Sequence, residues 1–284
     1  MNGISVITCS RSAKAPSSFL NNITETIGIE HEVIAIDNSE NNYSIFEAYN
    51  LGVAQSNYDI LCFVHDDIKV HTNNWGKILR GLFSSDPSIG LIGVTGTRVK
   101  TKMPSTWWSC PEDEKVLHIM QHLEKGKVEN WHTGFEKHSL VDVAVIDGVF
   151  MVAKKDDSIK FEESFKGFHN YDLHLSFETI KKGKKVVATN KILIEHFSFG
   201  TLNKSWYAST IQIHKMYGDI LPLKVNSNME EKAIMRLETE NGIWMAYKLL
   251  ELNLKKEALA IWSKIFLLKP ISKFHLKFLK AFLS

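Results

Sequence analysis

The sequence predicts an α/β fold, in which a mostly parallel sheet is flanked by helices and followed by a C-terminal helical extension. Over the first half of the chain, short apolar runs of β-forming residues alternate with helical patterns, the order typical of parallel sheets with right-handed crossovers. The central run, Ile60 to Val64, is continuously apolar, as expected for a strand buried on both faces. After about residue 200 the pattern becomes helical, which predicts two units, residues 1–200 and residues 201–284.

The predicted elements follow one another without internal repeats. The expected strands cover Ile4–Cys9, Glu32–Ile36, Ile60–Val64, Ile89–Val94, Val141–Ile146, Val149–Ala153, Lys184–Thr189 and Ile192–Ile194. The expected helices cover Ser18–Ile27, Ile45–Gln55, Trp75–Phe83 and Tyr171–Ile180. Residues 100–139 show no regular period, which predicts a long irregular connection.

Composition places the chain among ordinary globular proteins. It has 284 residues, 44% of them apolar, and a net charge of +2, which gives no reason to expect a nucleic acid partner. Cys9, Cys62 and Cys110 are odd in number and widely spaced, so they predict neither a disulfide framework nor a zinc site. The amino terminus shows no basic leader and no apolar run approaches transmembrane length, so we expect a cytoplasmic protein.

Acidic residues recur where predicted strands end. His65, Asp66 and Asp67 follow the central strand directly, and Asp37 follows the strand before it. Open α/β sheets place their ligands at the carboxyl ends of strands, and adjacent carboxylates repel each other unless a cation lies between them. Oxygen ligands of this kind suit Mg²⁺ or Mn²⁺, either of which suits a diphosphate. An acidic turn without a ligand is the alternative explanation of the same residues.

Two other nucleotide-binding patterns are not supported. Gly90, Gly93 and Gly96 lack the close Gly-x-Gly pair that dinucleotide-binding loops need. No Gly-x-x-x-x-Gly-Lys-Ser/Thr motif occurs, which argues against a P-loop nucleoside triphosphatase. A nucleotidyltransferase would also use paired carboxylates and metal, but its glycine- and lysine-rich amino-terminal loop is missing.

Residues 4 to 200 together resemble the family-2 glycosyltransferases that have the GT-A fold and use nucleotide-diphosphate sugars. The resemblance depends on the order of several motifs, namely Ile36-Asp-Asn-Ser39, Ala48 to Ala54, Val64-His-Asp-Asp67, Asp147-Gly-Val-Phe-Met151, Tyr171-Asp172 with Gly183, and Glu195-His196. Two positions depart from the family's pattern. His65 stands where most members have a small residue or an Asp, and Tyr171 stands where the family has Glu.

The resemblance implies a role for each motif. Nucleotide binding is implied for Thr8, Ser10, Arg11, Asp37, Asn38, Asn50 and Asp66. Asp67 and His196 would hold the divalent metal, and Asp147 and Gly148 would frame the acceptor pocket. Asp172 would be the catalytic base, although an Asp near the start of a helix also caps it or complements its dipole.

The implied activity is inverting transfer of a sugar from a UDP- or GDP-linked donor to a glycan or lipid-linked acceptor, as in surface polysaccharide synthesis. Displacement at the anomeric carbon needs the diphosphate charge neutralised and the acceptor hydroxyl deprotonated, which calls for a metal and one carboxylate. The two departures leave an alternative open, a non-catalytic module of the same fold that binds a nucleotide-sugar or a glycan. Measured nucleotide binding and turnover distinguish the two hypotheses.

The C-terminal extension carries two helical patterns, Glu230 to Leu254 and Lys256 to Leu268, that resemble one tetratricopeptide-like pair. A single pair cannot bury its own core, so we expect it to dock onto the first unit. The last segment places Ile271, Phe274, Phe278 and Phe282 on one helical face and lysines on the other. That pattern is typical of a helix lying on the inner face of a membrane, or of one covering an apolar patch of this chain or of a second copy in a homodimer.

Overall fold

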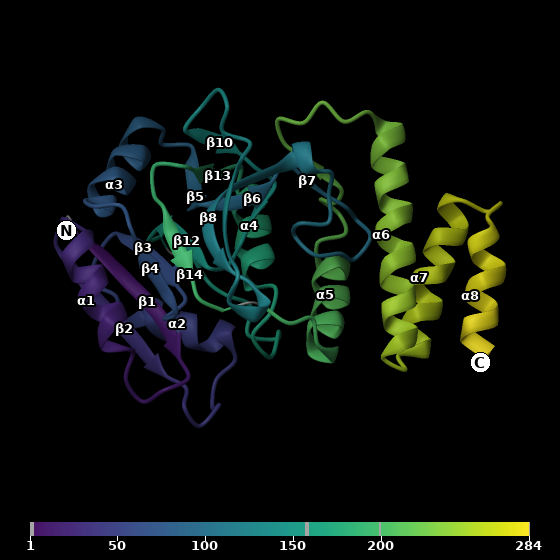
Figure 1. Cartoon of the computed structure of the whole chain (residues 1–284), viewed down its shortest axis with the longest axis horizontal. Coiled ribbons are helices and arrows are strands. Elements are labelled where there is room, and N and C mark those ends of the chain that lie inside the picture. The colour runs from purple at the N-terminus through teal and green to yellow at the C-terminus, as the bar shows by residue number, and fades with distance from the viewer. Residues whose placement is uncertain (1–2, 157–158, 199, 284) are drawn as a thin grey trace.

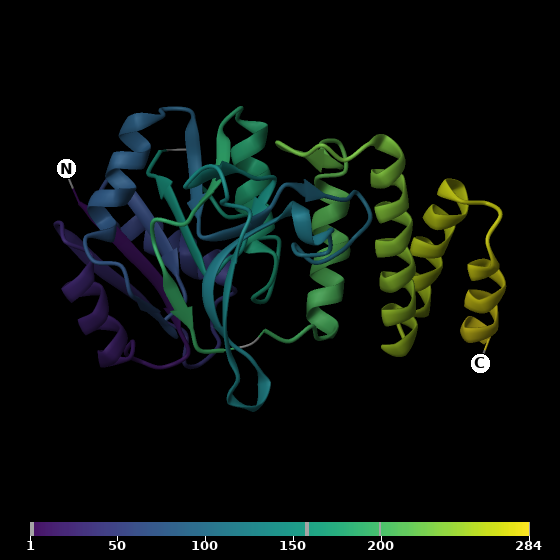
Figure 2. The same ribbon diagram turned by 45° about the horizontal axis from the view of Figure 1, so that its top comes forward.

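The computed structural model describes residues 3–156, 159–198 and 200–283, and it has the predicted α/β architecture (Figure 1). The strands and their flanking helices occupy one end of the molecule, and the helices of residues 231–283 stand side by side at the other. Both arrangements persist in the rotated view of Figure 2.

The larger sheet contains the strands predicted in the first half of the chain. In spatial order they are β10 (Leu140–Asp142), β13 (Lys185–Thr189), β5 (Ile89–Gly93), β12 (Phe150–Lys154), β3 (Ile60–Val64), β1 (Ile4–Ser10) and β2 (His31–Asp37). β1 pairs in parallel with β2 and β3, and β5 pairs in parallel with β13. β12 is antiparallel to both of its neighbours, and β10 is antiparallel to β13. The sheet is therefore mixed, with β10 and β12 running opposite to the other five strands.

Helices cover both faces of this sheet. α1 (Ser17–Thr26) and α3 (Trp75–Ser85) pack on one face, and α2 (Ile45–Gln55) and α4 (Tyr171–Lys181) pack on the other. Successive side chains of β3 point alternately into the two hydrophobic cores, one on each face of the sheet. Cys62 and Val64 face α1 and α3, and Leu61 and Phe63 face α2 and α4. Burial on both faces explains why this strand contains only apolar residues.

Six of the described strands form a second sheet. In spatial order they are β11 (Val145–Ile146), β6 (Thr95–Thr97), β8 (Lys115–His122), β14 (Ile194–His196) and β4 (Ile68–Val70), with β9 (Val128–Thr133) paired to β8. The expectation that residues 100–139 are irregular is wrong for β8 and β9, which form an antiparallel hairpin. Polar residues such as His118 and Gln121 interrupt the apolar pattern of β8 and conceal it. The strand expected from Val141 to Ile146 is divided between the two sheets.

The C-terminal part is helical, as expected. It contains α5 (Lys204–Met216), α6 (Glu231–Glu251), α7 (Lys255–Leu268) and α8 (Lys273–Leu283), and β15 (Leu223–Lys224) pairs with β7 (Val99–Lys100). Two short 3₁₀ helices, Glu112–Glu114 and Glu124–Gly126, lie earlier in the chain. Within the described residues, no helix combines the length and apolarity that crossing a membrane would need.

Two contacts attach α6 to the strand-containing unit. The Glu238 carboxylate accepts hydrogen bonds from the backbone amides of Lys102, at 2.5 Å, and Met103, at 2.6 Å. The Asn241 side chain donates to Thr101 Oγ1 at 3.0 Å. By contrast, Ile213, Tyr217 and Leu221 belong to the core of the larger sheet. On this packing we propose that the helical extension begins after Leu221 rather than at residue 201.

Candidate active site

Three side chains from two strand ends meet at one point. His65 and Asp67 follow β3, and His196 ends β14. The His65 Nδ1 atom lies 3.2 Å from His196 Nε2 and 3.8 Å from Asp67 Oδ1, and His196 Nε2 lies 3.5 Å from Asp67 Oδ1. One ligand atom from each residue therefore lies within 4.8 Å of the others, which is the spacing of a metal-binding group. We call these three residues the metal group.

Neighbouring side chains orient both imidazoles of the metal group. The Oε1 atom of Gln121, on β8, accepts the hydrogen of His196 Nδ1 at 3.0 Å, so that His196 Nε2 faces Asp67. His65 Nε2 lies 2.6 Å from the Tyr171 hydroxyl, which leaves His65 Nδ1 facing the same point. Hydrogen bonds of this kind hold metal-binding histidines in the required tautomer.

The charge states of the metal group suit a cation. Burial and the neighbouring His196 lower the pKa of His65, so its imidazole is neutral and keeps a lone pair. Burial acts to raise the pKa of Asp67, but hydrogen bonds from His196 and Ser198 and the nearby His65 hold it well below its usual range. One carboxylate and two imidazoles form a donor set typical of a divalent metal.

Asp66 points to a different strand from Asp67. Its Oδ2 atom accepts the hydroxyl hydrogen of Ser10, at the end of β1, over 2.6 Å. Ser10 Oγ in turn accepts from the Ser12 amide at 3.3 Å. The two adjacent carboxylates are therefore divided between the β1 end and the metal group, which reduces their mutual repulsion.

The other predicted nucleotide-binding residues surround the ends of β1 and β2. Arg11 and Asp37 are exposed, and Asp37 accepts from the Ser39 amide at 2.9 Å. Thr8 is fully buried, and its hydroxyl has no hydrogen-bond partner in the described part of the chain. Asn38 holds a loop, because its side chain exchanges hydrogen bonds with the Tyr43 backbone at 2.9 Å.

The Asn50 amide is occupied elsewhere. Asn50 lies on α2, where its Nδ2 atom donates to the Phe161 carbonyl at 2.8 Å and its Oδ1 atom accepts from the Phe161 amide at 2.8 Å. Nδ2 also lies 2.8 Å from Glu163 Oε1. The structure therefore places Asn50 as an anchor for the segment before α4, with its hydrogen-bonding groups already engaged.

Asp172 lies in the first turn of α4 and is partly buried. Burial and the nearby Asp147 carboxylate raise the pKa of Asp172 to about 7. Its Oδ1 atom accepts from the Leu173 amide at 2.9 Å, whereas the N-cap position belongs to Asn170. Asp172 thus contacts the helix terminus without capping it. The pKa of its carboxyl group suits general-base catalysis near neutral pH.

Tyr171 packs against the turn that carries Asp147 and Gly148. A Cβ atom built on Gly148 would lie 2.5 Å from the Tyr171 hydroxyl oxygen, so only glycine allows this approach. Asp147 Oδ1 accepts from the Val149 amide at 2.8 Å, which fixes the turn. Through Tyr171, the predicted acceptor residues, the predicted base and the metal group are brought into one region.

Three residues in or next to the metal group were not among the expected ligands. His65 differs from the family's pattern, but its place beside Asp66 and Asp67 was a usable signal. Gln121 and Ser198 carried no signal, because Gln121 lies in a strand that the sequence concealed and Ser198 lies in a connecting segment.

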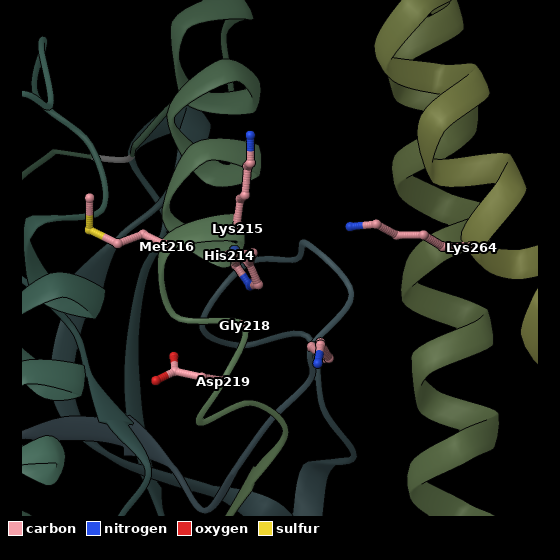
Figure 3. Close-up of a pocket in the computed structure, with 7 residues that line it drawn as sticks. His214, Lys215, Met216, Gly218, Asp219 and Lys264 are labelled. Atoms are coloured by element: carbon pink, nitrogen blue, oxygen red, sulfur yellow. The ribbon is translucent and has the colours of Figure 1, made fainter.

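A cavity of about 380 Å³ lies away from these residues, between α5 and α7. Figure 3 shows Lys264 extending from α7 toward α5, which carries His214 and Lys215. The lining of the cavity includes no residue of the metal group, and it includes neither Asp147 nor Asp172. The candidate site at the strand ends is therefore separate from this cavity.

The chain is similar to one protein family and to several solved structures. The profile of a family described as "Glycosyltransferase like family" matches residues 5–218. The structure of S. aureus TarS 1–349 in complex with UDP-GlcNAc is similar at 12% identity, over 94% of this chain and 80% of that chain, with a TM-score of 0.52. The structure of GalNAc-T7 with UDP, GalNAc and Mn²⁺ is similar at 10% identity, over 76% of this chain and 49% of that chain, with a TM-score of 0.52.

At these identities the two structures show a shared GT-A glycosyltransferase fold, and the chain spans about half the length of GalNAc-T7. None of the curated proteins matches the sequence. The family profile nevertheless covers most of the chain, including the strand ends that carry the site. The chain belongs to this glycosyltransferase-like family.

Proposed function

We propose that this protein transfers a sugar from a nucleotide-diphosphate donor to a hydroxyl acceptor, with a divalent metal and with inversion of configuration. The observation that carries the proposal is the pairing of the metal group with a carboxylate, Asp172, whose pKa is raised to about 7. A metal group alone would also suit a binding module. A partly buried base with a near-neutral pKa beside it favours an enzyme.

The donor set supports Mn²⁺ over Mg²⁺. Two of the three ligand atoms are imidazole nitrogens, from His65 and His196, and Mg²⁺ prefers a shell of oxygen atoms. Bound there, the cation would supply Lewis-acid neutralisation of the charge that develops on the diphosphate. Because both similar structures contain UDP or a UDP-sugar, we take a UDP-linked donor as the first candidate.

Asp172 would accept the proton of the acceptor hydroxyl. The hydroxyl oxygen then forms a bond to the anomeric carbon, while the bond from that carbon to the diphosphate oxygen breaks and its electron pair leaves with the diphosphate. A single displacement requires attack on the face opposite the leaving group, which inverts the configuration. Burial, together with like-charge repulsion from the nearby Asp147, keeps the pKa of Asp172 near neutrality.

Calorimetric titration with UDP, with Mn²⁺ or with EDTA, tests the binding half of the proposal. We expect binding that requires Mn²⁺ and is lost in Asp67→Ala. The catalytic half is tested by UDP release from a panel of UDP-sugars and hydroxyl acceptors, which should fall roughly 10²–10⁴-fold in Asp172→Asn while UDP affinity is retained. Metal-independent UDP binding would refute the metal group. Binding without turnover by the wild-type protein on any pair in the panel would favour the binding module.

A further inference from the structure

The C-terminal helix α8 has an inner face that is already covered. Phe274 packs edge-to-face on Tyr247 of α6, with ring centroids 5.6 Å apart, and Phe278 stacks on Trp262 of α7 at 5.8 Å. The expected apolar face of Ile271, Phe274, Phe278 and Phe282 is therefore not one free surface. Its phenylalanines pack on the protein's own helices, while Ile271, in the turn before α8, is 91% exposed.

The outer face of α8 carries a second apolar stripe. Leu276, Leu279 and Leu283 are spaced so that they follow one line along the helix, and all three are exposed. Leu276 and Leu283 are 74% and 81% exposed, and Leu267, at the end of α7, is 83% exposed. In the described part of the chain, every other large apolar side chain except Ile271 is at most 52% exposed. The most exposed apolar residues of the protein are thus gathered in one segment.

Lysines lie beside this stripe. Lys273, Lys277 and Lys280 occupy the part of α8 next to the leucines and are exposed. Lys269 precedes them, and the sequence contains no Asp or Glu after Glu257. An apolar stripe flanked by a row of cations, in a segment that contains no Asp or Glu, matches the interface between acyl chains and anionic headgroups.

We propose that the outer face of α8, with the preceding turn, docks on a membrane surface that contains anionic lipids. The leucine side chains would enter the boundary of the acyl chains, and the lysines would contact the headgroups. In Figures 1 and 2, α8 forms the end of the molecule opposite α1. Docking through this end holds the catalytic sheet away from the lipid, so it attaches the protein without covering the strand ends.

The charge distribution argues against a second copy as the occupant. A two-fold contact places the same surface on both sides of the interface. Lysines would then face lysines, and residues 258–284 provide no carboxylate to pair with them. An anionic lipid surface removes that repulsion, whereas a homodimer through this face would retain it.

Co-sedimentation of the full chain with vesicles tests the proposal without any substrate, so its outcome is separate from that of the proposed activity. The vesicles are phosphatidylcholine alone or phosphatidylcholine with phosphatidylserine. We expect binding to the anionic vesicles that weakens as salt increases. Lys273→Gln/Lys277→Gln/Lys280→Gln should lower the partition coefficient on the order of a hundred-fold, at about 1 kcal/mol per lysine. Leu276→Glu/Leu283→Glu should abolish binding.

Two control variants match these changes on other elements. Lys125→Gln/Lys137→Gln/Lys232→Gln removes the same charge, and Val128→Glu/Met216→Glu places two acids at exposed apolar positions. Both should bind like the wild type. Circular dichroism and thermal unfolding confirm that each variant folds. Absent wild-type binding, or equal binding to both vesicle types, overturns the proposal. A dimer in sedimentation velocity that disappears in Leu276→Glu/Leu283→Glu also overturns it, since the face would then belong to a second copy.

Discussion

The Nε2 atom of His65 lies 2.6 Å from the hydroxyl oxygen of Tyr171. The other nitrogen of the same imidazole belongs to the metal group, and Tyr171 directly precedes Asp172 at the start of α4. This hydrogen bond therefore connects the end of β3 to the helix that carries the proposed base. In this chain a Tyr–His pair occupies the place where the resemblance implies an acidic residue.

Removing that hydroxyl should weaken metal binding. In Tyr171→Phe, His65 loses the partner that fixes its ring and tautomer, while the aromatic packing is retained. Loss of such an orienting hydrogen bond typically costs 10- to 100-fold in metal affinity. We expect a decrease of that order in Mn²⁺ affinity, measured by paramagnetic-resonance titration of free Mn²⁺.

Tyr49→Phe is the matched control for this prediction. Tyr49 is a fully buried tyrosine whose ring lies 5.5 Å from that of Tyr171, and its hydroxyl has no hydrogen-bond partner in the described residues. Deleting this second hydroxyl should leave Mn²⁺ affinity unchanged. If Tyr171→Phe and Tyr49→Phe bind Mn²⁺ equally well, the hydrogen bond to His65 does not support the metal group.

Local patterns in the sequence anticipated much of this site, because strand ends are marked by abrupt changes from apolar to polar residues. Asp66 and Asp67 follow such a change, and their position at the mouth of the sheet required only the α/β pattern. Gln121 could not be anticipated, because its role depends on the pairing of β8 with β14, two segments far apart in the chain. The direction of the Asn50 amide likewise depends on a distant segment, residues 161–163.

Amphipathic patterns in the tail were less informative, since a helix can bury one apolar stripe and expose another. The spacing of the phenylalanines predicted an apolar face on α8. The sequence alone did not reveal that α6 and α7 cover this face. Only the packing distinguishes the covered stripe, with Phe274 and Phe278, from the exposed one, with Leu276 and Leu283.

Docking of α6 should depend on Glu238. Its carboxylate receives two backbone amides, from Lys102 and Met103, and in Glu238→Ala both lose their partner. Leaving such donors unsatisfied should lower the free energy of unfolding by about 2–4 kcal/mol, measured by urea denaturation. Glu240→Ala, on the same helix, removes only an exposed ion pair with Arg236 and should cost less than about 0.5 kcal/mol. Equal effects of the two substitutions would show that Glu238 does not hold the helix in place.

The raised pKa of Asp172 predicts how its substitution affects stability. In the folded protein the carboxyl keeps a proton up to about pH 7, whereas in the unfolded chain it loses the proton near its ordinary value of 3.8. Its contribution to stability is therefore complete below about pH 4 and is lost as the pH rises through 7. Asp172→Asn should match the wild type near pH 4 and become more stable than it at pH 8, on the order of a few kcal/mol. Unfolding midpoints in urea across this range provide the measurement.

Asp86→Asn should change the stability of the folded protein in the opposite direction from Asp172→Asn. Hydrogen bonds from Ser88 and Lys185 lower the pKa of Asp86 to about 2, so this carboxylate stabilises the folded state at neutral pH and loses that effect as the pH falls through 2. The Asn variant should be the less stable protein at pH 7, and its difference from the wild type should shrink toward low pH. Parallel pH trends for the two variants would contradict the assignment of a raised pKa to Asp172.

The same carboxylate should set the acid limb of the activity profile. Only unprotonated Asp172 can accept the acceptor's proton, so transfer should rise with pH and level off above the pKa. The positive charge of a bound cation nearby lowers that pKa, so the midpoint with metal should lie at or below about 7. We expect kcat/KM of the wild type to rise with pH between pH 5 and 8. The residual activity of Asp172→Asn should lack this rise. UDP affinity, measured at each pH, separates loss of binding from loss of the base. A wild-type limb that persists unchanged in Asp172→Asn would assign the proton acceptor to another group.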